Sequence, residues 1–187
     1  MRKILYIILL LFIATPLFGQ STVIVAKKKA ASCSTETQTC TTETSGQDSV
    51  VGATYTRKAW KFQAAETATI CKISINAKEV GNMTNTVVVG IYTDNSGNPG
   101  SLVGDASSAT DASGWGTDYA YRDFTVSAAV TATSEYWVHV QTSSTDGSNY
   151  IGMRQSNACD YEEGIEAYTD AWYTSDANAG IMYRMYK

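Results

Sequence analysis

The segment Cys71-Lys72-Ile73-Ser74-Ile75-Asn76-Ala77 alternates strictly between apolar and polar side chains. Successive side chains of an extended strand point to opposite faces of a sheet, so this pattern is typical of a half-buried strand. The same period of two recurs in Trp60-Lys61-Phe62, in residues 87–92 and in residues 136–140. No stretch of the sequence sustains a helical period. The sequence therefore predicts an all-β protein.

Further strands and the turns between them define the expected architecture. Residues 120–126 also alternate, with Arg122 as the polar exception on the inward face, and residues 151–153 and 181–185 follow. Clusters of turn-forming residues separate the strands, at residues 94–100, 111–116 and 143–149. About eight short strands with turns at this spacing indicate an antiparallel β-sandwich, and a jelly roll is the topology we expect.

The hairpin at residues 87–103, VVVGIYTDNSGNPGSLV, carries a resemblance to a known family. Together with Phe124-Thr125-Val126 and Tyr136-Trp137-Val138-His139-Val140, it resembles bacterial extracellular jelly-roll modules of the choice-of-anchor type, which are similar to carbohydrate-binding modules. The similarity covers residues 50–187. It implies a sandwich fold and no particular activity, because such modules occur in surface proteins, phage structural proteins and enzyme appendages.

Residues 1–19 have the layout of a secretory signal peptide. Positive Arg2 and Lys3 precede the uncharged apolar run Ile4–Ala14, and Gly19 supplies the small residue of a cleavage site. The apolar run is shorter than the roughly twenty residues that span a bilayer. We expect cleavage on export, which leaves a secreted, periplasmic or cell-surface protein without a membrane segment. An uncleaved N-terminal anchor is the alternative.

The composition changes beyond the predicted signal peptide. Residues 20–48 are rich in Ser and Thr and poor in large apolar residues, which is typical of a linker or an N-terminal arm. Residues 49–187 have the size and the pattern of one β-sandwich domain. The chain carries a net charge of −4. An acidic surface repels nucleic acids and anionic membranes, so neither is an expected partner.

The four cysteines fit an oxidising compartment. Four cysteines allow three pairings. We expect Cys33–Cys40 to close a small polar loop and Cys71–Cys159 to join distant strands. A zinc site does not fit, because Cys33 and Cys40 are too far apart for a Cys-x-x-Cys knuckle and a single histidine cannot complete a second ligand pair.

Tyrosine and tryptophan are the residues that point most clearly to binding. The chain holds 12 Tyr and 4 Trp beside only 4 Phe. Both side chains combine an apolar face with a polar group, and sugar rings stack on such faces. We predict a ligand-binding patch that includes Trp115, Tyr119, Tyr121, Trp172 and Tyr173. The alternative is that aromatic residues simply favour strands. Trp60 and Trp137 are assigned to packing.

The sequence contains no set of residues that we can assemble into a catalytic site. His139 is the only histidine; no serine or cysteine nucleophile can be assigned to it, so we interpret it as a surface or partly buried strand residue. The turn that starts at Asp94 is interpreted as a hairpin turn, with a calcium site as the alternative. A second acidic group is interpreted as a solvated loop, with calcium binding or glycoside hydrolysis as alternatives: Asp160, Glu162, Glu163 and Glu166.

These features together favour an exported binding or adhesion module that is not an enzyme, with calcium as the single cofactor left open. The expected partner is a glycan or an extracellular protein. The first alternative is a structural subunit of a surface layer, filament or appendage, in which residues 21–47 add a strand to the open sheet edge of a neighbour. A small glycoside hydrolase is a remote alternative.

Overall fold

The computed structural model describes residues 33–42, 48–156, 164–168, 171–176 and 180–187, and in these ranges it contains strands and no helix. The strands are β1 (Glu36–Cys40), β2 (Asp48–Val51), β3 (Arg57–Gln63), β4 (Ala68–Val80), β5 (Thr86–Asp94), β6 (Pro99–Leu102), β7 (Thr110–Asp111), β8 (Ala120–Val130), β9 (Glu135–Thr142), β10 (Tyr150–Ser156), β11 (Gly164–Tyr168), β12 (Ala171–Asp176), β13 (Gly180–Ile181) and β14 (Tyr183–Tyr186). The described residues include no helix with the length and apolar character needed to cross a membrane.

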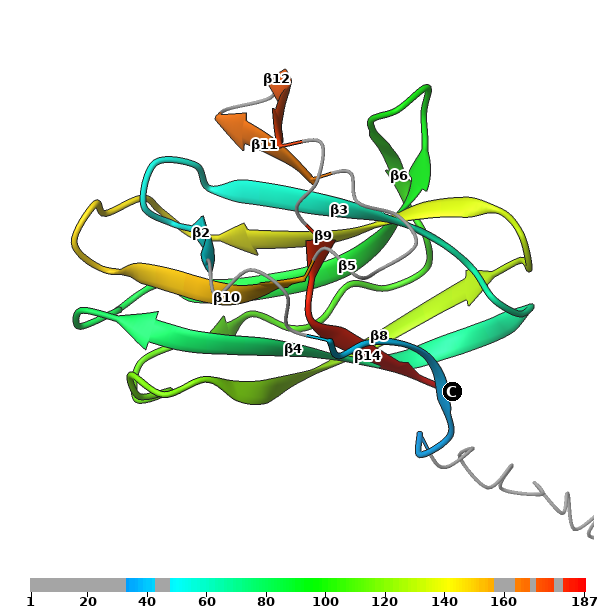
Figure 1. Cartoon of the computed structure of the whole chain (residues 1–187), viewed down its shortest axis with the longest axis horizontal. Coiled ribbons are helices and arrows are strands. Elements are labelled where there is room, and N and C mark those ends of the chain that lie inside the picture. The colour runs from blue at the N-terminus through cyan, green and yellow to red at the C-terminus, as the bar shows by residue number, and fades with distance from the viewer. Residues whose placement is uncertain (1–32, 43–47, 157–163, 169–170, 177–179) are drawn as a thin grey trace, which may run out of the picture. The chain divides into compact units, whose positions relative to one another are not determined.

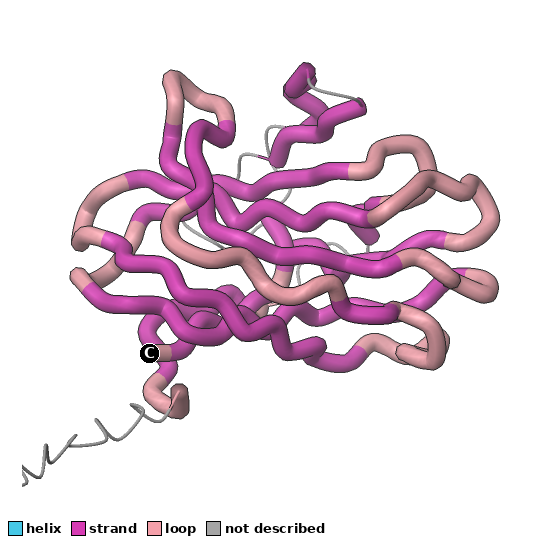
Figure 2. Tube along the Cα trace, turned by 180° about the vertical axis from the view of Figure 1, so that it is seen from behind, coloured by secondary structure: helices cyan, strands magenta, loops and turns pink. Residues whose placement is uncertain are grey.

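The strands form two antiparallel sheets (Figure 1). The first sheet has the order β1-β14-β4-β10-β13, with β8 beside β4 and β2 beside β10. The second has the order β12-β11-β3-β9-β5-β6, with β7 beside β5. Figure 2 shows the strands running side by side, with most loops gathered at their two ends. The predicted all-β sandwich is confirmed, and the jelly-roll order stays a prediction.

The core lies between the two sheets and is built from the apolar side of the alternation. Ile73 and Ile75 of β4 are at most 1% exposed. Val89 of β5 and Val138 of β9, from the second sheet, are fully buried in the same cluster. Burying a side chain of this size stabilises the fold by about 1.5–3 kcal/mol. The hydrophobic cluster therefore holds the two sheets together.

One strand of the first sheet comes from the segment that we expected to be a linker or arm. Residues Glu36–Cys40 form β1 and pair antiparallel with β14, with Cys40 opposite Tyr183. The side-chain nitrogen of Gln38 donates to the backbone oxygen of Gln63 (3.0 Å) and to the hydroxyl of Tyr183 (3.2 Å). Part of the segment 20–48 therefore belongs to the sandwich.

The expected cysteine pairing is wrong. Cys33 forms a disulfide with Cys71, with 5.8 Å between their Cα atoms. Cys40 lies at the far end of β1, and an extended strand rises about 3.3 Å per residue, which carries Cys40 out of reach of Cys33. Cys40 is disulfide-bonded as well. Cys159, which we expected to bond Cys71, lies outside the described residues.

Candidate functional site

The structure places the five predicted ligand-binding residues in different parts of the fold. Trp115 packs against the main core. Tyr119 and Tyr121 lie beside basic residues on the outer face of the first sheet. Trp172 packs on the outer face of the second sheet, and the side chain of Tyr173 lies outside the described part of the chain. One continuous patch of these five residues is therefore not formed.

Trp115 is half-buried at one end of the core. Its indole meets the ring of Phe124 edge to face, with 6.1 Å between the centroids. The guanidinium carbon of Arg122 lies 5.4 Å from the Trp115 ring, and Arg122 donates a hydrogen bond to the backbone oxygen of Trp115. The apolar cavity that Trp115 helps to line measures about 10 Å³, which leaves room for one water at most. These contacts explain how the inward-facing Arg122 is accommodated.

A second, smaller cluster covers the outer face of the second sheet. Trp137 of β9 and Ala59 of β3 are fully buried there, and Tyr92 of β5 and Trp172 of β12 pack against them. His139 joins this group through ring contacts with Tyr92 and Trp172. We call Tyr92, Trp137, His139 and Trp172 the aromatic cluster. Strands β3 and β9 are therefore buried on both faces, and Trp137 has the packing role that the sequence predicted.

His139 lies within the aromatic cluster and is only 4% exposed. Its ring meets Tyr92 and Trp172 edge to face, with 4.7 and 5.5 Å between the centroids. Burial, and then the positive charge of Arg57, lower the pKa of His139 to about 4. The imidazole is therefore neutral at pH 7. These contacts give His139 a packing role in a more deeply buried position than the sequence indicated.

Acidification is expected to destabilise the fold through His139. Its pKa is 6.5 in an unfolded chain and about 4 in the folded state. The stability contributed by the neutral imidazole is complete above pH 6.5 and is lost as the pH falls toward 4. We expect the free energy of unfolding, measured with urea, to fall by about 2 kcal/mol between pH 7 and pH 5.

The variant His139→Gln serves as the control for this pH dependence. His139 is the only histidine, so the variant holds no side chain with an ordinary pKa in this range. Its unfolding free energy should therefore stay nearly constant between pH 7 and pH 5. An equal decrease in the variant and in the unmodified protein would contradict the assignment.

Asp94, at the turn considered for calcium, has its carboxylate engaged by protein groups. Its Oδ1 accepts a hydrogen bond from the indole nitrogen of Trp137 (2.8 Å), and its Oδ2 accepts one from the backbone nitrogen of Gly97 (3.3 Å). The hairpin-turn interpretation agrees with these contacts. The described side chains contain no cluster of three or more His, Cys, Asp or Glu that could hold a metal. The other acidic candidates have side chains outside the described part: Asp160, Glu162, Glu163 and Glu166.

The outer face of the first sheet brings tyrosines and basic residues together. Ile73, Ile75 and Phe124 point into the core, so the alternate positions of β4 and β8 face outward. Side chains from β4, β8, β10 and β14 and from the segment before β8 meet on this side. We call them the tyrosine–cation face: Lys72, Lys78, Tyr119, Tyr121, Arg154, Arg184 and Tyr186.

Tyr119 lies between two cations at one end of the face. The Lys78 ammonium is 4.4 Å and the Arg154 guanidinium carbon is 4.0 Å from the centre of the Tyr119 ring. Gly152 of β10 lies beneath this group: a Cβ at that position would come within 3.2 Å of Lys78 and 3.4 Å of the Tyr119 hydroxyl. The glycine thus gives these two side chains room to lie close to the sheet.

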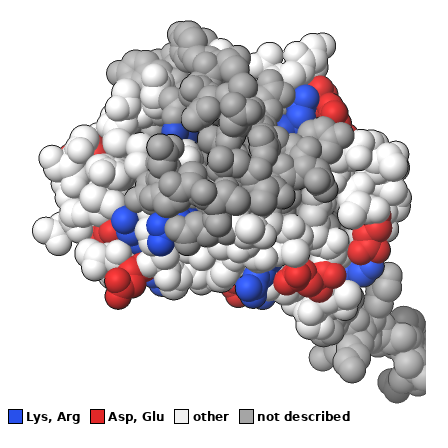
Figure 3. All heavy atoms as spheres, viewed as in Figure 1, with Lys and Arg blue, Asp and Glu red and all other residues white. Residues whose placement is uncertain are grey.

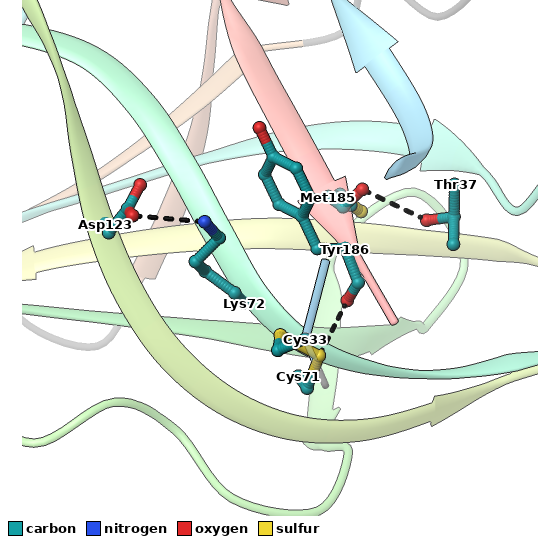
Figure 4. Close-up of a disulfide and its surroundings, with 7 residues drawn as sticks. All are labelled: Cys33, Thr37, Cys71, Lys72, Asp123, Met185 and Tyr186. Carbon is teal, nitrogen blue, oxygen red and sulfur yellow. Dashed lines mark hydrogen bonds and ion pairs between the residues drawn. A yellow bond between two sulfur atoms is a disulfide. The ribbon is translucent and has the colours of Figure 1, made fainter. Parts of the chain in front are cut away.

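Two further cation–tyrosine pairs continue the face toward the disulfide. The Arg184 guanidinium carbon lies 4.3 Å from the centre of the Tyr121 ring. The Lys72 ammonium lies 4.0 Å from the centre of the Tyr186 ring. Both side chains are drawn in Figure 4. Each such contact contributes about 0.5–1 kcal/mol at an exposed site. The pairs therefore help to fix long side chains that would otherwise be free to rotate.

Acidic side chains border the same face. Asp123 accepts hydrogen bonds from the Lys72 ammonium (3.1 Å) and from the Ser74 hydroxyl. A carboxylate oxygen of Glu36 lies 4.0 Å from Arg184 Nε. Figure 3 shows basic and acidic atoms next to one another along the lower side of the view. The tyrosine–cation face therefore offers both donors and acceptors of hydrogen bonds.

The sequence identified two tyrosines of this face but missed Tyr186 and the basic residues. The available signal was the period of two, which places Lys72 and Lys78 opposite the inward Ile73 and Ile75. The missing information was strand order, because β10 and β14 both lie beside β4 although they are distant from it in sequence. The alternation along one strand shows on which face a side chain lies. It does not show which side chains of the adjacent strands lie beside it.

The outer faces of the two sheets differ in how exposed their aromatic side chains and charged groups are. The aromatic cluster is largely buried, whereas the tyrosine–cation face presents half-buried rings, basic groups and an exposed carboxylate on one surface. Searches with protein-family models, against curated proteins and against solved structures find no match to the chain.

Proposed function

We propose that this protein is an exported, non-catalytic binding module that holds a glycan across the tyrosine–cation face. The observation that carries the proposal is the gathering of three tyrosine rings and their basic partners on one sheet face. Tyr and Arg are enriched among the residues that dominate binding energy, because they combine contact area with hydrogen bonds. The Cys33–Cys71 disulfide fits an oxidising compartment and supports export.

The contacts on this face favour hydrogen bonds as the main interaction with a glycan, in place of the stacking of sugar rings on aromatic side chains that the sequence suggested. An ammonium and a guanidinium lie near the ring of Tyr119 and a guanidinium lies near the ring of Tyr121, so a sugar meets at least one cationic donor beside each ring. Asp123 supplies an acceptor on β8. Sugar hydroxyls both donate and accept hydrogen bonds, and they match such a mixture. Hydrogen bonds to charged groups are the stronger kind, which suits a polar ligand on an open sheet face.

The proposal predicts glycan binding that depends on Tyr121 and Arg184. A glycan panel identifies a ligand, and calorimetry gives its Kd for the unmodified protein and for the double variant Tyr121→Ala with Arg184→Gln. We expect the Kd to rise about tenfold or more, which corresponds to about 1.4 kcal/mol, because a ring and its cation are both removed. Both side chains face away from the core, so the fold should be retained.

Trp172→Ala is the matched control for this measurement. It removes an aromatic side chain that is equally half-buried but lies on the other sheet. We expect it to leave the Kd unchanged, and a loss of affinity in this variant alone would contradict the assigned face. A parallel titration with a chelator tests the calcium alternative. The absence of any ligand on a broad panel would favour the structural subunit.

A further inference from the structure

The basic residues of the tyrosine–cation face follow the direction of β4. Lys72 and Lys78 belong to β4 itself, and six residues of an extended strand separate them by about 20 Å. Arg184 of β14 lies opposite Ser74, two residues from Lys72. Lys78 and Arg154 share one tyrosine ring at the other end. A strip of cations therefore follows β4, which extends across most of the sandwich in Figure 1.

The carboxylates beside Lys72 and Arg184 form exposed ion pairs. The Glu36 oxygen lies 4.0 Å from Arg184 Nε, and the two side chains are 42% and 39% exposed. Asp123, which Figure 4 shows paired with Lys72, is 58% exposed. Ion pairs between exposed side chains contribute little, because water and salt screen the charges. An anionic group of a ligand can therefore replace either carboxylate at small cost.

Arg184 has a donor that the described part of the chain does not use. Its Nε has no hydrogen-bond partner there, and the Glu36 oxygen that faces it is beyond hydrogen-bond distance. A guanidinium group binds a carboxylate through two parallel hydrogen bonds, which are stronger than bonds to a neutral hydroxyl. A ligand anion would therefore use the donors of Arg184 more fully than a neutral sugar does.

The net charge of −4 does not decide which ligand this face binds. At physiological ionic strength the charge of an exposed group acts over about 8 Å. A ligand on the strip therefore responds to the charges nearest to it, which are those of the cations and of the bordering Asp123 and Glu36. These two carboxylates also accept hydrogen bonds from hydroxyl groups, which favours an acidic glycan over a polyanion without hydroxyls.

We propose that the ligand of this face is a linear acidic glycan, with carboxylate or sulfate groups on its units, that lies along β4. This inference rests on the proposed function and narrows the class of glycan. Lys72 and Arg184 bind the anionic groups at one end of the strip, and Lys78 and Arg154 bind those at the other. Asp123 accepts hydrogen bonds from the sugar hydroxyls between them.

Calorimetry with two matched pairs of glycans, each pair of equal chain length, tests the charge of the ligand. One pair is an oligogalacturonate and its methyl ester, and the other is a cello-oligosaccharide with and without sulfate groups. We expect the acidic member of at least one pair to bind the exported protein about tenfold more tightly, because its bonds to the cations are charge-assisted. The pair that shows this preference distinguishes carboxylate from sulfate.

Salt and a double variant locate the interaction on the strip. Raising the salt concentration from about 0.1 M to about 1 M shortens the screening length from about 10 Å to about 3 Å, so the preference for the acidic member should shrink. In the variant Lys72→Gln with Arg184→Gln it should nearly disappear, while the neutral member binds as before, because glutamine still forms hydrogen bonds. Circular dichroism verifies that the variant is folded.

Arg57→Gln with Lys61→Gln is the matched control, because it removes the same charge from the outer face of the second sheet. It should retain the preference for the acidic member. Equal affinity for both members of each pair would overturn the acidic class and leave the proposed function in place. Failure to bind any glycan, acidic or neutral, would overturn both. Tighter binding of a single-stranded oligonucleotide than of either acidic glycan would also overturn the proposal and indicate a nucleic-acid ligand.

Discussion

Trp137→Ala is expected to lower the free energy of unfolding by about 3–5 kcal/mol. The indole is fully buried in the aromatic cluster on the outer face of the second sheet. Its nitrogen donates a hydrogen bond to Asp94 at 2.8 Å, and the Lys61 ammonium lies 5.5 Å from the ring. Truncation removes the packed ring, leaves a cavity and takes a donor from the Asp94 carboxylate.

Urea unfolding followed by circular dichroism measures this loss. Trp172→Ala is the control, because Trp172 belongs to the same cluster but is only half-buried. We expect a loss of about 1 kcal/mol from that variant. A loss below about 1 kcal/mol for Trp137→Ala would contradict the buried position of the indole. It would also show that the outer face of the second sheet is open.

Removal of the Cys33–Cys71 disulfide is expected to cost about 3–4 kcal/mol of stability. The bond joins residues that are 38 positions apart in sequence, and closing a loop of this length restricts the unfolded chain. In the folded state the bond also holds Cys33, which comes shortly before β1, against Cys71 of β4. The Cys71 sulfur lies 3.2 Å from the backbone oxygen of Tyr186 in β14, the strand with which β1 pairs (Figure 4).

The double variant Cys33→Ser with Cys71→Ser tests this effect without leaving an unpaired thiol. Its urea midpoint should fall while the folded circular dichroism spectrum is retained, because the core between the sheets is untouched. The backbone amide of Thr35, which donates to the backbone oxygen of Lys187, should also exchange faster with solvent, because Cys33 would no longer fix the chain just before β1. The far end of β1 would still be held by the disulfide-bonded Cys40. An unchanged midpoint would show that Cys33 and Cys71 are not bonded in the native protein.

The main core of the fold could be predicted because period-two alternation reports which side of a strand is buried. Trp60 and Trp137 were assigned to packing, and they are 3% and 0% exposed. Arg122 was placed on the inward face, and its contacts with Trp115 confirm that position. For Trp60 and Arg122 the pattern within one strand was sufficient, because Trp60 lies in the main core and Arg122 lies opposite the inward Ile75. Trp137 is buried on the outer face of its sheet by the aromatic cluster.

Features that depend on contacts between distant segments could not be predicted. The residues of β1 lack a strong apolar pattern: the contacts of Gln38 are hydrogen bonds to Gln63 and Tyr183, which no local period reveals. The alternation places His139 on the face opposite Val138 and Val140, where the sequence predicts contact with solvent. In the structure, Trp172 of β12, which is distant in sequence, packs against His139. The pairing of Cys33 with Cys71 follows from the position of β1.

The candidate site was predictable to the same limited extent. Tyr119 and Tyr121 were named from composition and local spacing, and the structure places both on the outer face of the first sheet. Of the basic residues over their rings, Lys78 comes from β4, Arg154 from β10 and Arg184 from β14. Only the strand order brings Arg154 and Arg184 beside these rings, and the order depends on the whole sheet.

The most direct test of the binding face is an NMR titration of the labelled protein with a glycan that the panel identifies. We expect the backbone signals of Tyr121, Asp123 and Arg184 to shift in proportion to bound ligand. The signals of Trp137 and His139 in the second sheet should stay in place. Shifts confined to the aromatic cluster, with the first sheet unaffected, would contradict the tyrosine–cation face as the site.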